Sequence, residues 1–132
     1  LQTHQSCPAS GVLVFSLTGE ATLPAKPQVE GKHLAPPPLL ASAETVTAGA
    51  ALYGKYCGVC HGDAVHSAGI LPDLRYSEIA QDQSQFADVV LGGALGENGM
   101  ASFASVLDAD SAETLRAYII ARANEDAKLG FN

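Results

Sequence analysis

The chain has 132 residues, 47% of them hydrophobic, which is enough for one modest domain with a single core. Its 14 acidic and 7 basic side chains give a formal net charge of −7 at pH 7, with no run of Lys or Arg, so the sequence argues against a nucleic-acid surface. No stretch approaches the roughly 20 apolar residues that span a bilayer, and we expect no transmembrane helix.

The first 41 residues differ in composition from the rest. Residues 12–17 read VLVFSL, a β-branched and aromatic run that predicts a strand. No partner strand follows in the sequence, so we expect an orphan strand within a remnant, residues 1–23, of an upstream β domain. The prolines between residues 24 and 38 predict an extended linker over residues 24–41. We therefore expect a fragment of a longer protein.

Residues 42–132 have the pattern of an all-α domain with three or four helices. Apolar residues spaced by three or four predict a first helix from Ser42 to the cysteines. Ser84 is a possible N-cap for a second helix over residues 86–91, which Gly92 and Gly93 would end. A last helix is predicted to start between residues 108 and 111. Its stripe of helical period would comprise Ala112, Leu115, Tyr118 or Ile119, and Arg122.

The chemistry is concentrated in the segment Cys57-Gly58-Val59-Cys60-His61. Two thiols about one helical turn apart can form thioether bonds to the two vinyl groups of one heme, and the adjacent imidazole can then bind the iron. The spacing therefore predicts attachment of one c-type heme through Cys57 and Cys60, with His61 as an iron ligand.

Two other interpretations of the cysteine pair fit the sequence poorly. A thioredoxin-like redox site needs a βαβ setting, which the sequence lacks. A zinc site needs a second pair of ligands, whereas the third cysteine, Cys7, is far upstream and the other histidines are scattered.

Met100 is the candidate for the sixth iron ligand. It follows His61 by 100 − 61 = 39 residues in the glycine-bearing segment Gly96-Glu97-Asn98-Gly99-Met100, where backbone can pass close to a flat ring. A soft thioether favours the ferrous state and suits an electron acceptor. The alternatives are that Met100 only fills the core, or that His66 is the ligand.

With the Cys57–His61 motif and Met100, the sequence resembles class I cytochromes c, and more closely the C-terminal cytochrome domain of PQQ-dependent quinohemoprotein alcohol dehydrogenases. The similarity extends over about residues 40–126. Upstream, residues 13–20 and 23–24 look like the closing strand of that family's β-propeller and the start of its linker. The segments that carry the resemblance are 49–53, 57–62, 71–75, 89–93, 99–103 and 115–119.

The resemblance implies further roles for single residues. Pro72 would offer its carbonyl to the second ring nitrogen of His61. Arg75 would pair with a heme propionate, although it could instead be an ordinary surface arginine. Helix packing would join Gly49, Tyr53 and Tyr118. The family pattern does not require Cys7, which could be a free thiol or form an intermolecular disulfide.

The resemblance also implies a function, namely single-electron transfer in the periplasm. The heme would accept electrons from reduced PQQ in the upstream propeller and pass them to a blue copper protein, a cytochrome or a quinone-linked oxidase. PQQ and calcium would be bound only in that missing domain, so this chain would carry no catalytic residue. The parent protein would be a PQQ-dependent alcohol dehydrogenase.

Two alternatives stay open. One is a free-standing monoheme cytochrome c whose N-terminal strand folds back on the heme domain. The other is a heme sensor that binds a small gas at an open iron position, which requires Met100 to be a core residue or an easily displaced ligand.

Overall fold

The structure is a computed structural model that describes residues 18, 35–67 and 71–129. The chain divides into two compact units, Leu1–Lys32 and His33–Asn132. The predicted strand over residues 12–17 lies outside the described residues, and so does the predicted linker up to residue 34. The helical domain belongs to the second unit.

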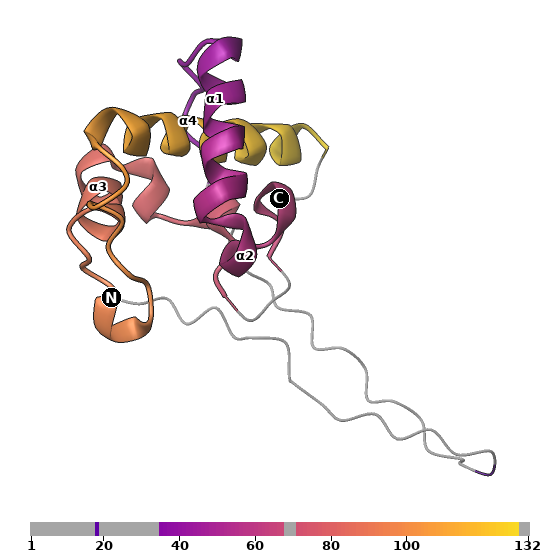
Figure 1. The fold of residues 1–132 in the computed structure, drawn as a ribbon. Coiled ribbons are helices and arrows are strands. Elements are labelled where there is room, and N and C mark those ends of the chain that lie inside the picture. Colours follow the sequence, from indigo (N-terminus) through magenta and orange to yellow (C-terminus); the bar gives the residue numbers. More distant parts are fainter. Residues whose placement is uncertain (1–17, 19–34, 68–70, 130–132) are drawn as a thin grey trace. The chain divides into compact units, whose positions relative to one another are not determined.

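Within these described ranges the second unit is helical and has no strand, as the sequence predicted. The helices are α1 (Ala43–Tyr56), the single turn α2 (Gly58–His61), α3 (Gln83–Val90) and α4 (Ala109–Lys128) (Figure 1). Short 3₁₀ turns connect them: η1 (Asp63–Val65), η2 (Leu74–Tyr76), η3 (Ile79–Gln81) and η4 (Gly96–Asn98).

Polar caps start the three longer helices. The side chain of Ser42 accepts a hydrogen bond from the backbone N–H of Thr45, and Asp108 caps α4 in the same way. The prediction of Ser84 as the cap of α3 is wrong, because Asp82 is the cap and accepts from the N–H of Gln85 at 2.9 Å. Ser84 already lies in the first turn, where its hydroxyl donates to the Asp82 carboxylate.

The crossing of α1 over α4 organises the domain (Figure 1). Gly49 lies at the crossing, where a β-carbon would collide with the Thr114 carbonyl oxygen and would lie 2.7 Å from Cβ of Tyr118. One turn later, the rings of Tyr53 and Tyr118 pack with their centroids 5.4 Å apart. The packing of Gly49 and Tyr53 against Tyr118, which the resemblance implied, is therefore confirmed.

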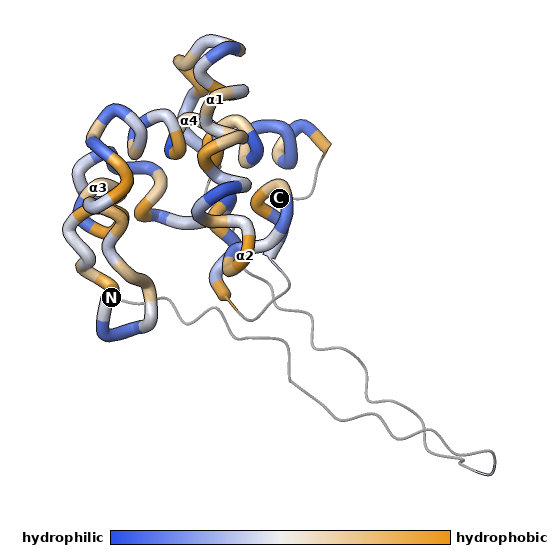
Figure 2. Tube along the Cα trace, viewed as in Figure 1, coloured by the Kyte–Doolittle hydropathy of each residue, from blue (hydrophilic) through white to orange (hydrophobic). Residues whose placement is uncertain are grey.

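One face of α4 supplies much of the core. Figure 2 shows hydrophobic and hydrophilic residues alternating along α4 over short distances. No helix in the described part of the chain is long and apolar enough to cross a membrane. The buried residues of the core cluster are Tyr53, Val65, Ala80, Phe86, Val90, Leu107, Ala112, Leu115 and Ile119.

The last residues of the predicted linker are fastened to the helical domain. Residues 35–42 form neither helix nor strand. The carbonyl oxygen of Pro37 accepts a hydrogen bond from the side-chain amide of Asn124 on α4 at 2.9 Å. A polar contact to a residue 87 positions later thus fixes the point where the chain enters the domain.

Candidate heme site

The two cysteines and the histidine of the motif share one tight turn. The backbone N–H of Cys57 ends α1 by donating to the Tyr53 carbonyl at 2.8 Å, and the Cys57 carbonyl then accepts from the N–H groups of Cys60 and His61. Both thiols are free, Cys57 half-buried and Cys60 exposed. Between them Val59 is 95% exposed. Two thiols and an imidazole are therefore held at the surface by one short stretch of backbone.

The exit from this turn depends on Gly62, which has φ +85°. A β-carbon at Gly62 would collide with the carbonyl oxygen of His66, so only glycine fits both the angle and the space. The buried hydroxyl of Tyr53 donates to the Gly62 carbonyl at 2.9 Å. Burial raises the pKa of this hydroxyl above its ordinary value, so it stays protonated and able to donate. Tyr53 thus links α1 to the residue after His61.

Tyr53→Phe should lower the free energy of unfolding by about 1 to 2 kcal/mol, because the ring packing is kept while the Gly62 carbonyl loses its buried donor. Denaturant unfolding of the heme-loaded protein measures this change. Tyr118→Phe is the matched control, since the hydroxyl that donates to the Gly62 carbonyl belongs to Tyr53 and not to Tyr118. Equal stability of Tyr53→Phe and the parent chain would show that the hydrogen bond contributes nothing.

Pro72 and His61 lie together, as the resemblance implied for them. The Pro72 carbonyl oxygen is 3.4 Å from Nδ1 of His61. When Nδ1 carries the proton it can donate to this carbonyl, and the lone pair on Nε2 is then available to a metal. The arrangement suits an imidazole that binds a metal through Nε2 while a hydrogen bond from Nδ1 to the Pro72 carbonyl fixes the ring.

The structure places Arg75 in a buried ion-pair cluster. Its guanidinium forms a fork on Asp73, with Nε–Oδ1 and Nη2–Oδ2 distances of 2.9 and 2.7 Å, and Nη1 lies 2.9 Å from Oδ1 of Asp126. The Arg75 side chain is only 9% exposed, so it is no ordinary surface arginine. Hydrogen bonding to Asp73 raises the pKa of the guanidinium further. A contact between Arg75 and a heme propionate stays a prediction.

Met100 lies in the loop between α3 and α4. It is half-buried, packs against the core cluster, and its N–H donates to the Leu95 carbonyl at 3.1 Å. The Phe103 ring, three residues later, meets the Tyr56 ring beside Cys57, with centroids 6.2 Å apart. In Figure 1 this loop and α2 lie on the same side of α4.

The other interpretations of the cysteine pair gain no support. Within the described ranges no group of three or more His, Cys, Asp and Glu residues could hold a metal ion. Burial raises the pKa of the Cys57 thiol to about 11, whereas a thioredoxin-like thiol needs a lowered pKa. His66 is exposed and lies 3.5 Å from guanidinium nitrogens of both Arg75 and Arg122. Cys7 lies outside the described residues.

These residues fit a heme c. The two free thiols of Cys57 and Cys60 lie beside the His61 imidazole, whose Nδ1 already faces the Pro72 carbonyl oxygen. The half-buried thioether of Met100 lies in a separate loop. Thioether attachment requires unpaired cysteines, and axial ligation requires one free imidazole nitrogen. The described residues at the site offer both.

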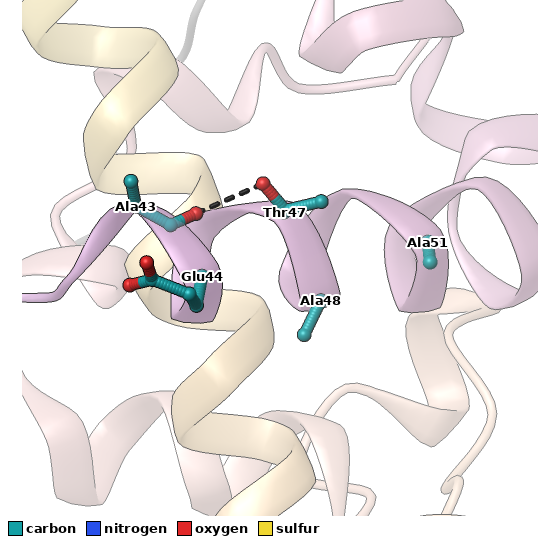
Figure 3. A pocket seen from close by; sticks show the side chains of 5 residues that line it. All are labelled: Ala43, Glu44, Thr47, Ala48 and Ala51. Carbon is teal, nitrogen blue, oxygen red and sulfur yellow. Dashed lines mark hydrogen bonds between the residues drawn. The ribbon is translucent and has the colours of Figure 1, made fainter.

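A shallow hollow on the outer side of α1 is separate from this site (Figure 3). Its one internal hydrogen bond runs from the Thr47 hydroxyl to the Ala43 carbonyl at 2.9 Å. Small side chains and one carboxylate line it, so it offers no reactive constellation. The lining residues are Ala43, Glu44, Thr47, Ala48 and Ala51.

Comparison with known proteins supports the same family. The family model described as "Cytochrome C oxidase, cbb3-type, subunit III" matches residues 44–119. Quinohemoprotein alcohol dehydrogenase ADH IIB of Pseudomonas putida is 42% identical over 118 residues, covering 89% of this chain and 17% of that protein. The dehydrogenase subunit of alcohol dehydrogenase (quinone) of Acetobacter aceti is 39% identical, covering 88% of this chain and 16% of that subunit.

A solved structure shares the fold. The quinohemoprotein alcohol dehydrogenase ADHIIG from Pseudomonas putida HK5 matches with a TM-score of 0.70 and 33% sequence identity. The match covers 83% of this chain and 16% of that chain. The present chain therefore spans about a sixth of the length of the relatives it matches.

Proposed function

Because the chain belongs to the cytochrome c family described as cytochrome c oxidase, cbb3-type, subunit III, and is homologous to the C-terminal cytochrome c domain of quinohemoprotein alcohol dehydrogenases, we propose that it transfers single electrons through one covalent heme c. The observation that carries this proposal is the single turn that presents Cys57, Cys60 and His61 together. No catalytic residue is assigned, because the chain's task is to carry electrons.

Each residue of the site has a defined part in this proposal. Cys57 and Cys60 would hold the porphyrin through thioether bonds, His61 would offer Nε2 to the iron, and the Pro72 carbonyl would accept from Nδ1. Met100 would supply a second iron ligand from the loop between α3 and α4. When bound, heme supplies an iron centre that changes oxidation state by one electron. Met100 would favour the ferrous state, because its thioether is a soft ligand.

We further propose a donor, an acceptor and a compartment. The donor is reduced PQQ in an upstream propeller domain, which would also bind calcium, and the parent protein is a PQQ-dependent alcohol dehydrogenase of the periplasm. The acceptor is an external blue copper protein, cytochrome or quinone-linked oxidase. The names and lengths of the relatives support this assignment over a free-standing cytochrome. Several hundred residues of propeller repeats upstream in the parent reading frame would discriminate the two.

Met100→Ala should abolish the far-red ferric absorption band of iron–thioether bonding and lower the reduction potential, because the ferrous state loses its soft ligand. Visible spectra and a potentiometric titration of the heme-loaded protein measure both changes. Val106→Ala, a change at an exposed residue of the same connecting segment, is the control and should alter neither. An unchanged band in Met100→Ala would contradict the ligand assignment. Carbon monoxide binding to the undenatured ferrous parent chain would instead favour the gas-sensor alternative.

The net charge of −7 predicts opposite salt effects with redox reagents of opposite charge. Oxidation or reduction of the heme by a small cationic complex should slow as ionic strength rises, because salt screens the attraction that speeds encounter. The rate with an anionic complex should increase under the same conditions. Stopped-flow kinetics at several salt concentrations measure both rates. Rates independent of salt for both reagents would rule out steering by the acidic surface.

A further inference from the structure

Asp126 stands out on α4 because it is a buried charged side chain, 7% exposed. It lies near the C-terminal end of a helix that runs from Ala109 to Lys128. The helix dipole disfavours a carboxylate at this end, and burial removes most of its hydration. Neither the helix dipole nor hydration therefore stabilises the Asp126 carboxylate. Its stabilising partners come from another segment.

Both partners come from η2. Nη1 of Arg75 lies 2.9 Å from Oδ1 of Asp126, and the hydroxyl of Tyr76 donates to Oδ2. The side chains of Arg75 and Asp126 are 9% and 8% exposed, so the pair is shielded from water. Burial, followed by the hydrogen bond to Asp126, raises the pKa of the Tyr76 hydroxyl to about 12, which keeps it protonated as a donor. One carboxylate thus fastens two consecutive residues to α4.

The fastened segment begins next to the carbonyl that faces His61. Asp73 follows Pro72 directly, and its carboxylate accepts from the backbone N–H of Arg75 at 3.1 Å and from the guanidinium of the same residue. The Tyr76 N–H donates to the Asp73 carbonyl at 3.2 Å. This closed turn has little freedom to move without breaking the contacts to Asp126. The Pro72 carbonyl oxygen, 3.4 Å from Nδ1 of His61, is carried by the same turn.

We propose that Asp126 is a positioning residue for the heme site: by clamping Arg75 and Tyr76 to α4 it holds the Pro72 carbonyl against His61. The inference rests on the proposed function, since it matters only when His61 binds iron. A hydrogen bond to the outer nitrogen fixes the ring and raises the basicity of the ligating nitrogen. Loosening the clamp makes His61 a weaker donor to ferric iron, so the reduction potential rises.

The test compares three variants of the full heme-loaded chain. Asp126→Asn weakens the clamp and removes one negative charge, whereas Tyr76→Phe removes one clamp contact without changing the charge. Glu125→Gln is the matched control, because it also removes one negative charge, one residue before Asp126. The Glu125 side chain is exposed and pairs with Arg122, so this change does not touch the clamp. The measurements are the reduction potential and the exchange rate of the His61 ring N–H in the reduced protein by NMR.

We expect Asp126→Asn and Tyr76→Phe to speed exchange of the ring N–H by about tenfold, and Glu125→Gln to leave it unchanged. At a fixed applied potential the ferrous-to-ferric ratio should increase about threefold in Tyr76→Phe, equivalent to a rise of about 28 mV at 59 mV per tenfold. At the same applied potential, the ferrous-to-ferric ratio of Asp126→Asn should exceed that of Glu125→Gln by a similar factor. If Asp126→Asn does not fold, Tyr76→Phe decides.

Two results would overturn this inference alone, and a third would overturn the proposed function together with it. A wild-type chain with a His61/Met100 heme but unchanged exchange and potential in Tyr76→Phe removes this inference and leaves the proposed function intact. Equal shifts in Asp126→Asn and Glu125→Gln would likewise mean that only charge is felt at the heme. A wild-type chain that binds no heme removes both proposals, so the two failures are distinguishable.

Discussion

Replacing Cys57 and Cys60 together by alanine is expected to abolish covalent heme attachment. Both thiols are free and sit on one turn, so each supplies one thioether bond and the double variant retains none. His61 and Met100 would then hold the heme only by coordination to its iron. The measurement is heme retained on the polypeptide after acid–acetone extraction, with essentially all of it expected in the parent chain and none in the double variant.

Cys7→Ala is the control for this experiment, because it removes a thiol outside the motif. It should keep its full heme content. Each single variant, Cys57→Ala or Cys60→Ala, should retain heme through one remaining bond but at lower yield. Heme that resists extraction from the double variant would disprove thioether attachment at these two residues. Heme lost from Cys7→Ala would mean that the motif is not sufficient for attachment.

Gly49→Ala should lower the free energy of unfolding by about 2 kcal/mol, because the added methyl group overpacks the crossing of α1 and α4. Its nearest neighbour would be the Thr114 carbonyl oxygen, which is backbone and cannot rotate away. The helices must therefore separate, and this also disturbs the contact between Tyr53 and Tyr118. Chemical denaturation of the heme-loaded protein, followed by far-UV circular dichroism, measures the change.

Gly54→Ala provides a control of opposite sign on the same helix. A β-carbon there meets nothing within 4 Å, so alanine adds helix propensity without a clash. We expect a gain of about 0.5 to 1 kcal/mol in the free energy of unfolding. A destabilised Gly54→Ala with an unaffected Gly49→Ala would contradict the packing described for this crossing.

Features that depend on local sequence were predictable. The apolar spacing and Ser42 give α1, Asp108 gives the start of α4, and the all-α class follows from the absence of a second strand pattern. The heme motif is local too, since its chemistry resides in five consecutive residues. The ligand roles of His61 and Met100 stay predictions.

Features that depend on distant contacts were missed. The resemblance implies only a packing role for Tyr53, although its hydroxyl also donates a hydrogen bond to the Gly62 carbonyl. The sequence leaves Arg75 as a propionate partner or a surface residue, whereas in the structure Arg75 pairs with Asp126, 51 positions later. A signal existed, because Asp126 follows the buried residues Leu115 and Ile119 at helical spacing, where a charge is unexpected. Its partner could not be read from the sequence alone.

Electron transfer by this chain requires one heme bound covalently at the Cys57–His61 turn. The most direct test is the intact mass of the denatured protein after expression with cytochrome c maturation enzymes. We expect the mass of the polypeptide plus one heme, with the added mass localised by proteolysis to the peptide that contains Cys57 and Cys60. The bare polypeptide mass, or heme on another peptide, would contradict it.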